Sequence, residues 1–185
     1  MNILRPALLA LALAASLPAL AASNDVTDPN KPRAVQVEGP VSVSWTDPSQ
    51  FSDLRFSGNR WEAARGDWVN ELATHLQKSA SKRLPAGQQM EVTITDIQRA
   101  GRYEPWHGMQ YDRVRFLRDH YPPRMTLNVR IIDADGRVLA EGERKLADTS
   151  YMMSSSIRAD SDLLRYEKRM IDTWVRRELE RAPAV

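Results

Sequence analysis

The sequence predicts an α+β domain in which a β-α-β unit is followed by a β-hairpin and a C-terminal helix. Apolar and polar residues alternate with a period of two in residues 41–45, 90–97 and 125–131, as in half-buried strands. Apolar residues recur at helical spacing in residues 59–82 and 161–181. Because these segments follow one another along the chain, we expect two helices packed on one face of a mixed four- or five-stranded sheet.

The first helix is predicted from Asn59 to Lys82. Asn59 followed by Glu62 resembles a capping box, which favours a helix start at this point. One apolar stripe at helical spacing contains Trp61, Ala64, Trp68, Leu72 and Leu76. We expect both tryptophans of this stripe to anchor the helix against the sheet, since large aromatic side chains contribute strongly to cores.

The hairpin pairs residues 125–131 with a return strand at residues 137–146. A two-residue loop places Val129 opposite Ala140 and keeps apolar residues paired with apolar residues. A three-residue loop with a glycine bulge places Val129 opposite Glu141, and the Asp-Ala-Asp-Gly turn suits this form better. The sequence leaves both registers open.

The last helix is predicted at residues 161–181. It carries two neighbouring apolar rows, one with Leu163, Met170 and Trp174 and the next with Leu164, Ile171 and Val175. Arginines cluster near its C-terminal end, where the helix dipole favours positive charge.

The N-terminal residues 1–21 resemble an export signal, with an apolar run and an Ala-Leu-Ala cleavage site that ends at Ala21. We therefore expect a periplasmic or secreted protein with no transmembrane span, since the run is short for a bilayer. Residues 22–40 lack periodicity and are expected to be a flexible leader. Residues 41–181 form a single expected domain, and residues 182–185 a tail.

Composition narrows the chemistry. The chain has no cysteine, so neither disulfides nor thiolates are expected. Loss of Arg5 with the signal leaves 25 cationic and 24 acidic residues, a net charge of +1, which argues against nucleic-acid binding. The histidines, at positions 75, 107 and 120, are far apart and form no zinc motif, so no metal or cofactor is expected.

One segment, residues 98–124, stands out for its six arginines and five aromatic residues. Arginine binds phosphate or carboxylate in a planar fork, and aromatic rings offer stacking faces. The candidate binding residues are Arg113, Arg115, Arg118, Tyr121 and Arg124, with an anionic envelope component as partner. The alternative is that the arginines pair with local acids and cover the aromatic rings as a solvated lid.

If residues 114–117 are extended, Arg113 and Arg115 share one face and Arg118 lies on the other. The six arginines then cannot all serve one ligand. On this interpretation Arg118 pairs with an acid such as Asp96.

Three stretches resemble the bacterial domain-of-unknown-function family DUF3016: VSVSWTDPSQFSD, RDHYPPRMTLNVRIIDADGRVLAEGERKLAD and LLRYEKRMIDTW. The resemblance runs from Val41 to about Leu179. It implies the same fold and an envelope location, and it implies no activity and no catalytic residue.

Two classes of function remain. The first is a non-catalytic binding or envelope-accessory module that uses the arginine-rich segment. The second is a small hydrolase or transferase with a site near Asp119, His120 and Arg118. A visible nucleophile and base are missing, which favours the first class, and a concave pocket at His120 with a carboxylate and a hydroxyl in reach would favour the second.

Overall fold

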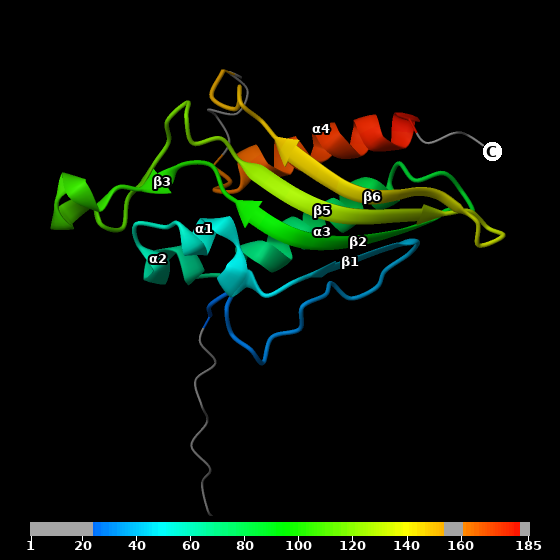
Figure 1. Cartoon of the computed structure of the whole chain (residues 1–185), viewed down its shortest axis with the longest axis horizontal. Coiled ribbons are helices and arrows are strands. Elements are labelled where there is room, and N and C mark those ends of the chain that lie inside the picture. The colour runs from blue at the N-terminus through cyan, green and yellow to red at the C-terminus, as the bar shows by residue number, and fades with distance from the viewer. Residues whose placement is uncertain (1–23, 154–160, 182–185) are drawn as a thin grey trace, which may run out of the picture.

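The structure is a computed structural model that describes residues 24–153 and 161–181, so the expected signal and tail lie outside the described residues. Its centre is a four-stranded sheet with the order β1-β2-β5-β6 (Figure 1). The strands are β1 (Val41–Trp45), β2 (Gln89–Gln98), β5 (Arg124–Ile132) and β6 (Val138–Ala147). β1 runs parallel to β2 and the other pairs are antiparallel, which confirms the predicted mixed sheet.

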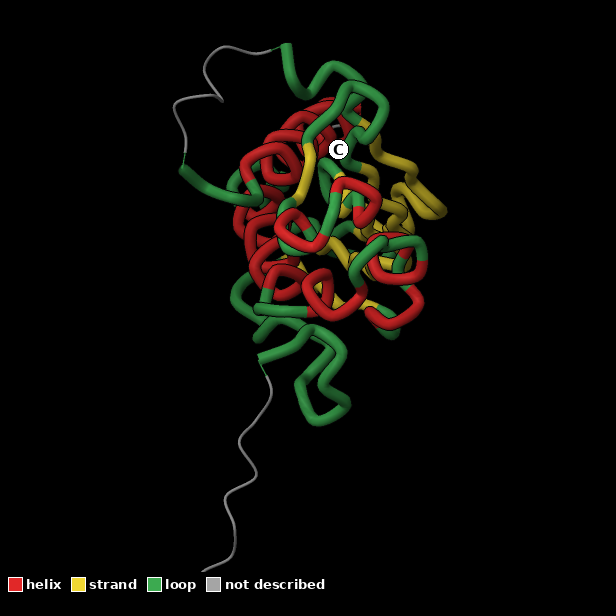
Figure 2. Tube along the Cα trace, turned by 90° about the vertical axis from the view of Figure 1, so that its left-hand side faces the viewer, coloured by secondary structure: helices red, strands yellow, loops and turns green. Residues whose placement is uncertain are grey.

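Two long helices, α3 (Trp68–Ser81) and α4 (Arg165–Arg181), pack side by side on one face of this sheet. Figure 2 shows the helices on one side of the strands when the sheet is seen end-on. The core between the layers includes Val43, Leu72, Leu76, Ile94, Leu127, Ile131 and Ile171, all at most 2% exposed. The predicted arrangement of a β-α-β unit, a hairpin and a C-terminal helix is confirmed.

Shorter elements gather at one end of the sheet. They are the helices α1 (Ser52–Arg55) and α2 (Arg60–Ala64), the strands β3 (Arg102–Tyr103) and β4 (Arg115–Phe116), and the 3-10 turns η1 (Pro48–Gln50), η2 (Pro105–His107) and η3 (Met109–Tyr111). β3 and β4 pair antiparallel in a second sheet. In Figure 1 the segment between β3 and β4 projects beyond the end of the main sheet.

The predicted single helix over residues 59–82 is wrong, because the chain breaks into α2 and α3. Asn59 caps α2 as expected, with its side-chain oxygen accepting from the Glu62 N–H at 3.1 Å. Gly66 then adopts φ +91°, a left-handed conformation that glycine tolerates and that ends α2. As a result Trp61 is 59% exposed, whereas Trp68 is 4% exposed in the core.

Both hairpin registers considered from the sequence are wrong, since Val129 pairs with Gly142. The register shifts by one residue near the turn, where Ile132 pairs with Val138. The Asp133 carboxylate explains the longer loop, because it accepts from the backbone N–H groups of Asp135 at 3.0 Å and Arg137 at 2.8 Å.

Residues 24–40 contact the domain, in contrast to the flexible leader expected from the sequence. The Val35 N–H donates to the Val43 carbonyl, and the Trp45 N–H donates to the Arg33 carbonyl, each at 2.9 Å. Val26 is buried in the core. The physical reason is that β1 is an edge strand with unpaired backbone groups, and this segment supplies partners for them.

Helix α4 begins at Arg165 rather than at residue 161, and Leu163 ahead of it is exposed. Leu163 therefore does not join the apolar row of Met170 and Trp174. The second row, with Leu164, Ile171 and Val175, is buried as expected. None of the helices in the described residues is long and apolar enough to cross a membrane.

Candidate functional site

The arginines of residues 98–124 do three different things in the structure. The first group is buried at the junction of α1 and β2. The Asp53 carboxylate, 1% exposed, accepts from Arg99 Nε at 3.0 Å and from Arg99 Nη2 at 2.8 Å, and it also accepts from Arg115 Nη2. Burial alone raises the pKa of Asp53, but the charges of Arg115 and Arg99 outweigh it and hold this pKa below its ordinary value.

Arg115 has further buried partners. Its Nε donates to the Ala100 carbonyl at 2.8 Å, and its guanidinium lies over the ring of Tyr103. Since all its donors face protein groups, Arg115 serves to fix β4 against β2 and α1. The sequence-based expectation that Arg113 and Arg115 share one face is wrong, because Arg113 points to α2.

The second group surrounds Glu104, which is 2% exposed. Glu104 accepts from Arg118 through both oxygens, at 2.8 and 2.6 Å, from Tyr121 Oη at 3.0 Å, and lies 2.8 Å from His107 Nε2. Hydrogen bonding from Arg118 in particular lowers the pKa of Glu104 to about 2. Arg118 thus pairs with Glu104, while the carboxylate of Asp96 accepts from Ser52 instead.

The third group is exposed. Arg113 forms an ion pair with Glu62, with its Nε 3.1 Å from Glu62 Oε1; its side chain is 74% exposed and lies over the ring of Trp61. The exposed side chain of Arg124, at the start of β5, has no acid partner in residues 24–153 and 161–181. The five candidate binding residues therefore do not form one site. Arg118 and Tyr121 share Glu104, Arg115 binds Asp53, and only Arg113 and Arg124 of the five are exposed.

A surface that the sequence indicated only in part lies beside Arg113. We call it the aromatic end. It consists of the exposed side chains of Phe56, Trp61, Trp106, Met109, Tyr111, Val114 and Leu117. These are seven of the eleven large apolar side chains that are exposed in the described residues, so the exposed apolar surface is concentrated at one end.

The aromatic end is also basic. Residues 51–65 and 99–121 contain eight arginines and five acidic residues, a net charge of +3, whereas the whole chain carries +2. The rest of the chain is therefore slightly acidic on balance. This end thus combines a net positive charge with the exposed aromatic side chains of Phe56, Trp61, Trp106 and Tyr111.

Two parts of the chain are locked together to make this end. Asn59 Nδ2 donates to the Asp112 carbonyl at 2.9 Å, and Arg102 Nη2 donates to the Phe56 carbonyl at 2.7 Å. A Cβ at Gly58 would lie 2.4 Å from the Tyr103 carbonyl oxygen, so only glycine permits this close approach. The aromatic end is thus a fixed surface rather than two independent loops.

Within the aromatic end, two guanidinium groups lie against the ring of Trp61. The Arg65 carbon Cζ is 4.9 Å and the Arg113 Cζ is 5.6 Å from the ring centroid, and Glu62 pairs with both arginines. The pattern of helical spacing assigned Trp61 to the core because it could not show the break at Gly66. An indole held by two arginines and left exposed is a preorganised contact for a ligand.

The surroundings of His120 bear on the alternative of an enzymatic site. His120 lines a cavity of about 250 Å³ together with Ser52, Asp53 and Tyr121. However, His120 is exposed and makes no hydrogen bond within the described residues, and the hydroxyl of Ser52 donates to Asp96 at 2.7 Å. The carboxylate of Asp53 is taken up by Arg99 and Arg115. The cavity therefore contains the groups of an acid–base site without the hydrogen bonds that would couple them.

Within the part of the chain that the structure describes, no three His, Asp or Glu side chains gather in a way that could hold a metal ion. In a comparison with known protein families, the model of the family described as "Protein of unknown function (DUF3016)" matches residues 39–177. No curated protein and no solved structure matches the chain.

Proposed function

The chain belongs to the DUF3016 family of proteins of unknown function, and we propose that it is an exported, non-catalytic binding module of the periplasm. In this proposal the aromatic end attaches the protein to an anionic membrane surface of the cell envelope. The export part of the proposal rests on the signal-like residues 1–21.

The observation that carries the proposal is that the exposed ring of Trp61 contacts both Arg65 and Arg113 within a basic and aromatic surface. Tryptophan and tyrosine favour the headgroup region of a membrane, because one part of each ring system is apolar and another part donates hydrogen bonds. Arginine adds charge-assisted hydrogen bonds to lipid phosphate. A membrane interface satisfies both requirements at once.

The shape of this end supports a membrane in preference to a protein partner. The segment that carries Trp106 and Met109 projects from the body between β3 and β4 (Figure 1). Met109 is 88% exposed and Trp106 is 68% exposed. Projecting side chains insert readily between lipid headgroups, whereas a protein interface normally needs a broader complementary surface.

Co-sedimentation with lipid vesicles tests this function. The protein without residues 1–21 is mixed with vesicles of phosphatidylglycerol and phosphatidylcholine, or of phosphatidylcholine alone, at low and physiological salt. We expect binding to the anionic vesicles that weakens as salt rises. Arg113→Gln should reduce the affinity about fivefold, since one basic residue near an anionic surface contributes about 1 kcal/mol.

The matched control is Arg176→Gln, an exposed arginine in the C-terminal part of α4, at the opposite end of the molecule from β3 (Figure 1). It should bind anionic vesicles as the unaltered protein does. Equal binding by Arg113→Gln and the unaltered protein would overturn the role of the aromatic end. Isolated peptidoglycan serves as a second surface, and binding to peptidoglycan alone would assign the partner to the cell wall instead.

A further inference from the structure

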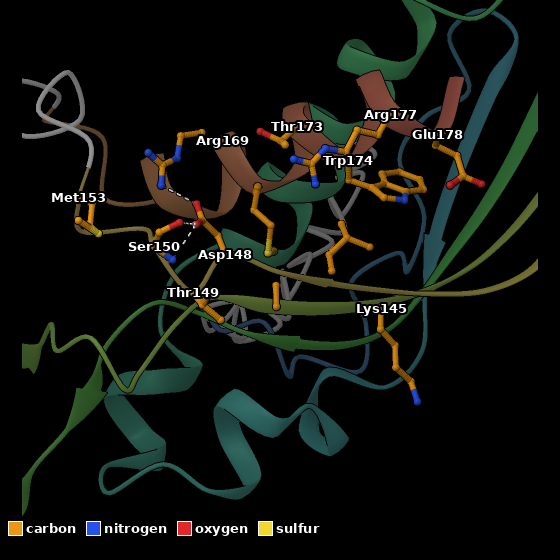
Figure 3. Close-up of a pocket in the computed structure, with 13 residues that line it drawn as sticks. Lys145, Asp148, Thr149, Ser150, Met153, Arg169, Thr173, Trp174, Arg177 and Glu178 are labelled. Carbon is orange, nitrogen blue, oxygen red and sulfur yellow. Dashed lines mark hydrogen bonds and ion pairs between the residues drawn. The ribbon is translucent and has the colours of Figure 1, made fainter. Parts of the chain in front are cut away.

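A groove separates β6 from α4 on the side of the molecule away from β1. Its volume is about 720 Å³, within the range of ligand-binding cavities. One wall is formed by residues 145–150 of β6 and the following turn, and the other by the side of α4 that carries Thr173, Trp174 and Arg177 (Figure 3). The groove belongs to other elements than the aromatic end, so it needs a separate explanation.

Two ion pairs join the walls and frame the groove. Arg144 Nε of β6 donates to Glu178 Oε1 of α4 at 2.7 Å. Beyond the end of β6, Asp148 accepts from Arg169, which Figure 3 shows on the opposite wall. These pairs hold α4 at a fixed distance from the strand and leave an opening between them.

The charge of the groove is unbalanced because both of its acids are already paired. Glu178 is neutralised by Arg144, and Asp148 is neutralised by Arg169. Arg177, which is exposed, has no partner in residues 24–153 and 161–181. The groove is therefore complementary to a ligand with a negative charge near Arg177.

Besides its charged groups, the groove has an apolar floor and an unpaired strand edge. The floor is apolar, with buried Leu146 and Met170 and partly buried Trp174. Strand β6 is the last strand of the sheet, so one side of its backbone has no strand partner in the described residues. Free backbone donors and acceptors on an edge strand can pair with an added strand.

Strand addition by a second copy of this chain is not favoured. Glu141, Glu143 and Lys145 alternate along β6 and are exposed, a charge pattern that protects sheet edges from pairing with one another. A shorter segment that stays beside residues 145–148, which line the groove, lies next to Lys145 and beyond Glu141 and Glu143. The α4 wall from Arg169 to Glu178 is roughly 14 Å long, which corresponds to about four residues of extended chain.

We propose that the groove between β6 and α4 binds an extended acidic peptide segment of a partner protein. The segment adds to the edge of β6 as a fifth strand, its apolar side chains cover Leu146 and Met170, and one carboxylate pairs with Arg177. This interaction is independent of attachment through the aromatic end and makes the protein an adaptor with two binding surfaces.

Fluorescence anisotropy with defined peptides tests the proposal. The probe is a fluorescein-labelled hexapeptide of alternating glutamate and valine. One comparison peptide has lysine in place of glutamate, and another has the acidic sequence with alternate backbone nitrogens methylated. We expect saturable binding of the acidic peptide and about tenfold weaker binding of the other two, since each lacks one of the two kinds of contact.

Neighbouring arginines on α4 provide the matched variants. Arg177→Gln should weaken binding of the acidic peptide about tenfold, which corresponds to about 1.4 kcal/mol. Arg176→Gln, one residue away and outside the groove, should leave binding unchanged. Both side chains are exposed, so neither change should alter the melting temperature, and a melt of each variant verifies this.

Three results would overturn the proposal. The first is no preference for the acidic over the lysine peptide at millimolar concentration. The second is an equal loss for Arg176→Gln and Arg177→Gln, which would mean non-specific attraction. The third is full affinity for the N-methylated peptide, which would exclude strand addition. By contrast, slower hydrogen exchange of the β6 amides on peptide binding would support strand addition directly.

Discussion

Replacing Asp53 with asparagine should lower the free energy of unfolding far more than the replacement of any surface charge. The carboxylate neutralises Arg99 and Arg115, and the side chains of these arginines are only 13% and 20% exposed. Asp53→Asn keeps the shape of the side chain and removes the charge. The two guanidinium groups then remain close together without the Asp53 carboxylate, and they are too buried for water to compensate for its loss.

The expected cost is roughly 3–5 kcal/mol, the range found when one partner of a buried ion pair is removed. Arg99 also receives support from its donation to the Ala63 carbonyl at 2.9 Å and from the ring of Trp68, 4.1 Å from its Cζ. Those contacts remain in the variant, so we expect a folded but less stable protein. Urea unfolding followed by circular dichroism measures the difference in the free energy of unfolding.

Glu62→Gln is the matched control, because Glu62 also pairs with two arginines. Its partners Arg65 and Arg113 are 52% and 74% exposed, and water compensates for much of the lost interaction. The expected cost is about 0.2–1 kcal/mol. If Asp53→Asn costs no more than Glu62→Gln, the buried arginines are not structural, and the assignment of Arg115 to the architecture fails.

Three further predictions follow from the same contrast between buried and exposed groups. Trp68→Ala should cost roughly 3–5 kcal/mol in urea melts, whereas Trp61→Ala should cost less than about 1 kcal/mol because its ring is exposed; similar losses would contradict the break at Gly66. The pKa of Glu104 is lowered to about 2. The ionised Glu104 side chain therefore stabilises the folded protein above its ordinary pKa of 4.5, and this contribution disappears as pH falls from there towards 2. The melting temperature of Glu104→Gln should therefore lie below that of the unaltered protein at pH 7 and approach it in acid, and a constant difference would refute this. Burial raises the pKa of Glu167, so stability should fall as pH rises from 4.5 through the raised value; Glu167→Gln should remove this fall, and an unchanged pH profile of its melting temperature would contradict the reasoning.

The sequence was a good guide wherever periodicity reflects burial. Alternation in residues 41–45, 90–97 and 125–131 predicted the strands, and helical spacing predicted the core faces of α3 and α4. The failures occur where one residue overrides the pattern. Gly66 interrupts a continuous helical pattern, and the carboxylate of Asp133 stabilises a longer loop than pairing preferences indicated.

The arginine-rich segment was harder to interpret because its partners are distant in sequence. Asp53 lies 46 residues before Arg99 and 62 before Arg115, so no local pattern connects them. Glu104 is close to Arg118 in the sequence, but its burial depends on the pairing of β3 with β4. Composition alone indicated an unusual segment, but it could not show which arginines form buried ion pairs and which are exposed.

The division has a physical logic. The segment between β2 and β5 folds over the end of the sheet without a disulfide, since the chain has no cysteine. Of its five aromatic side chains only Tyr103 is buried, while Trp106 and Tyr111 are exposed, so apolar burial contributes little to holding it in place. Two buried carboxylates, Asp53 and Glu104, do so instead by binding Arg99, Arg115 and Arg118. These arginines are committed to the fold, and the same ion pairs that stabilise the segment keep the aromatic end exposed and rigid, as the proposed binding function requires.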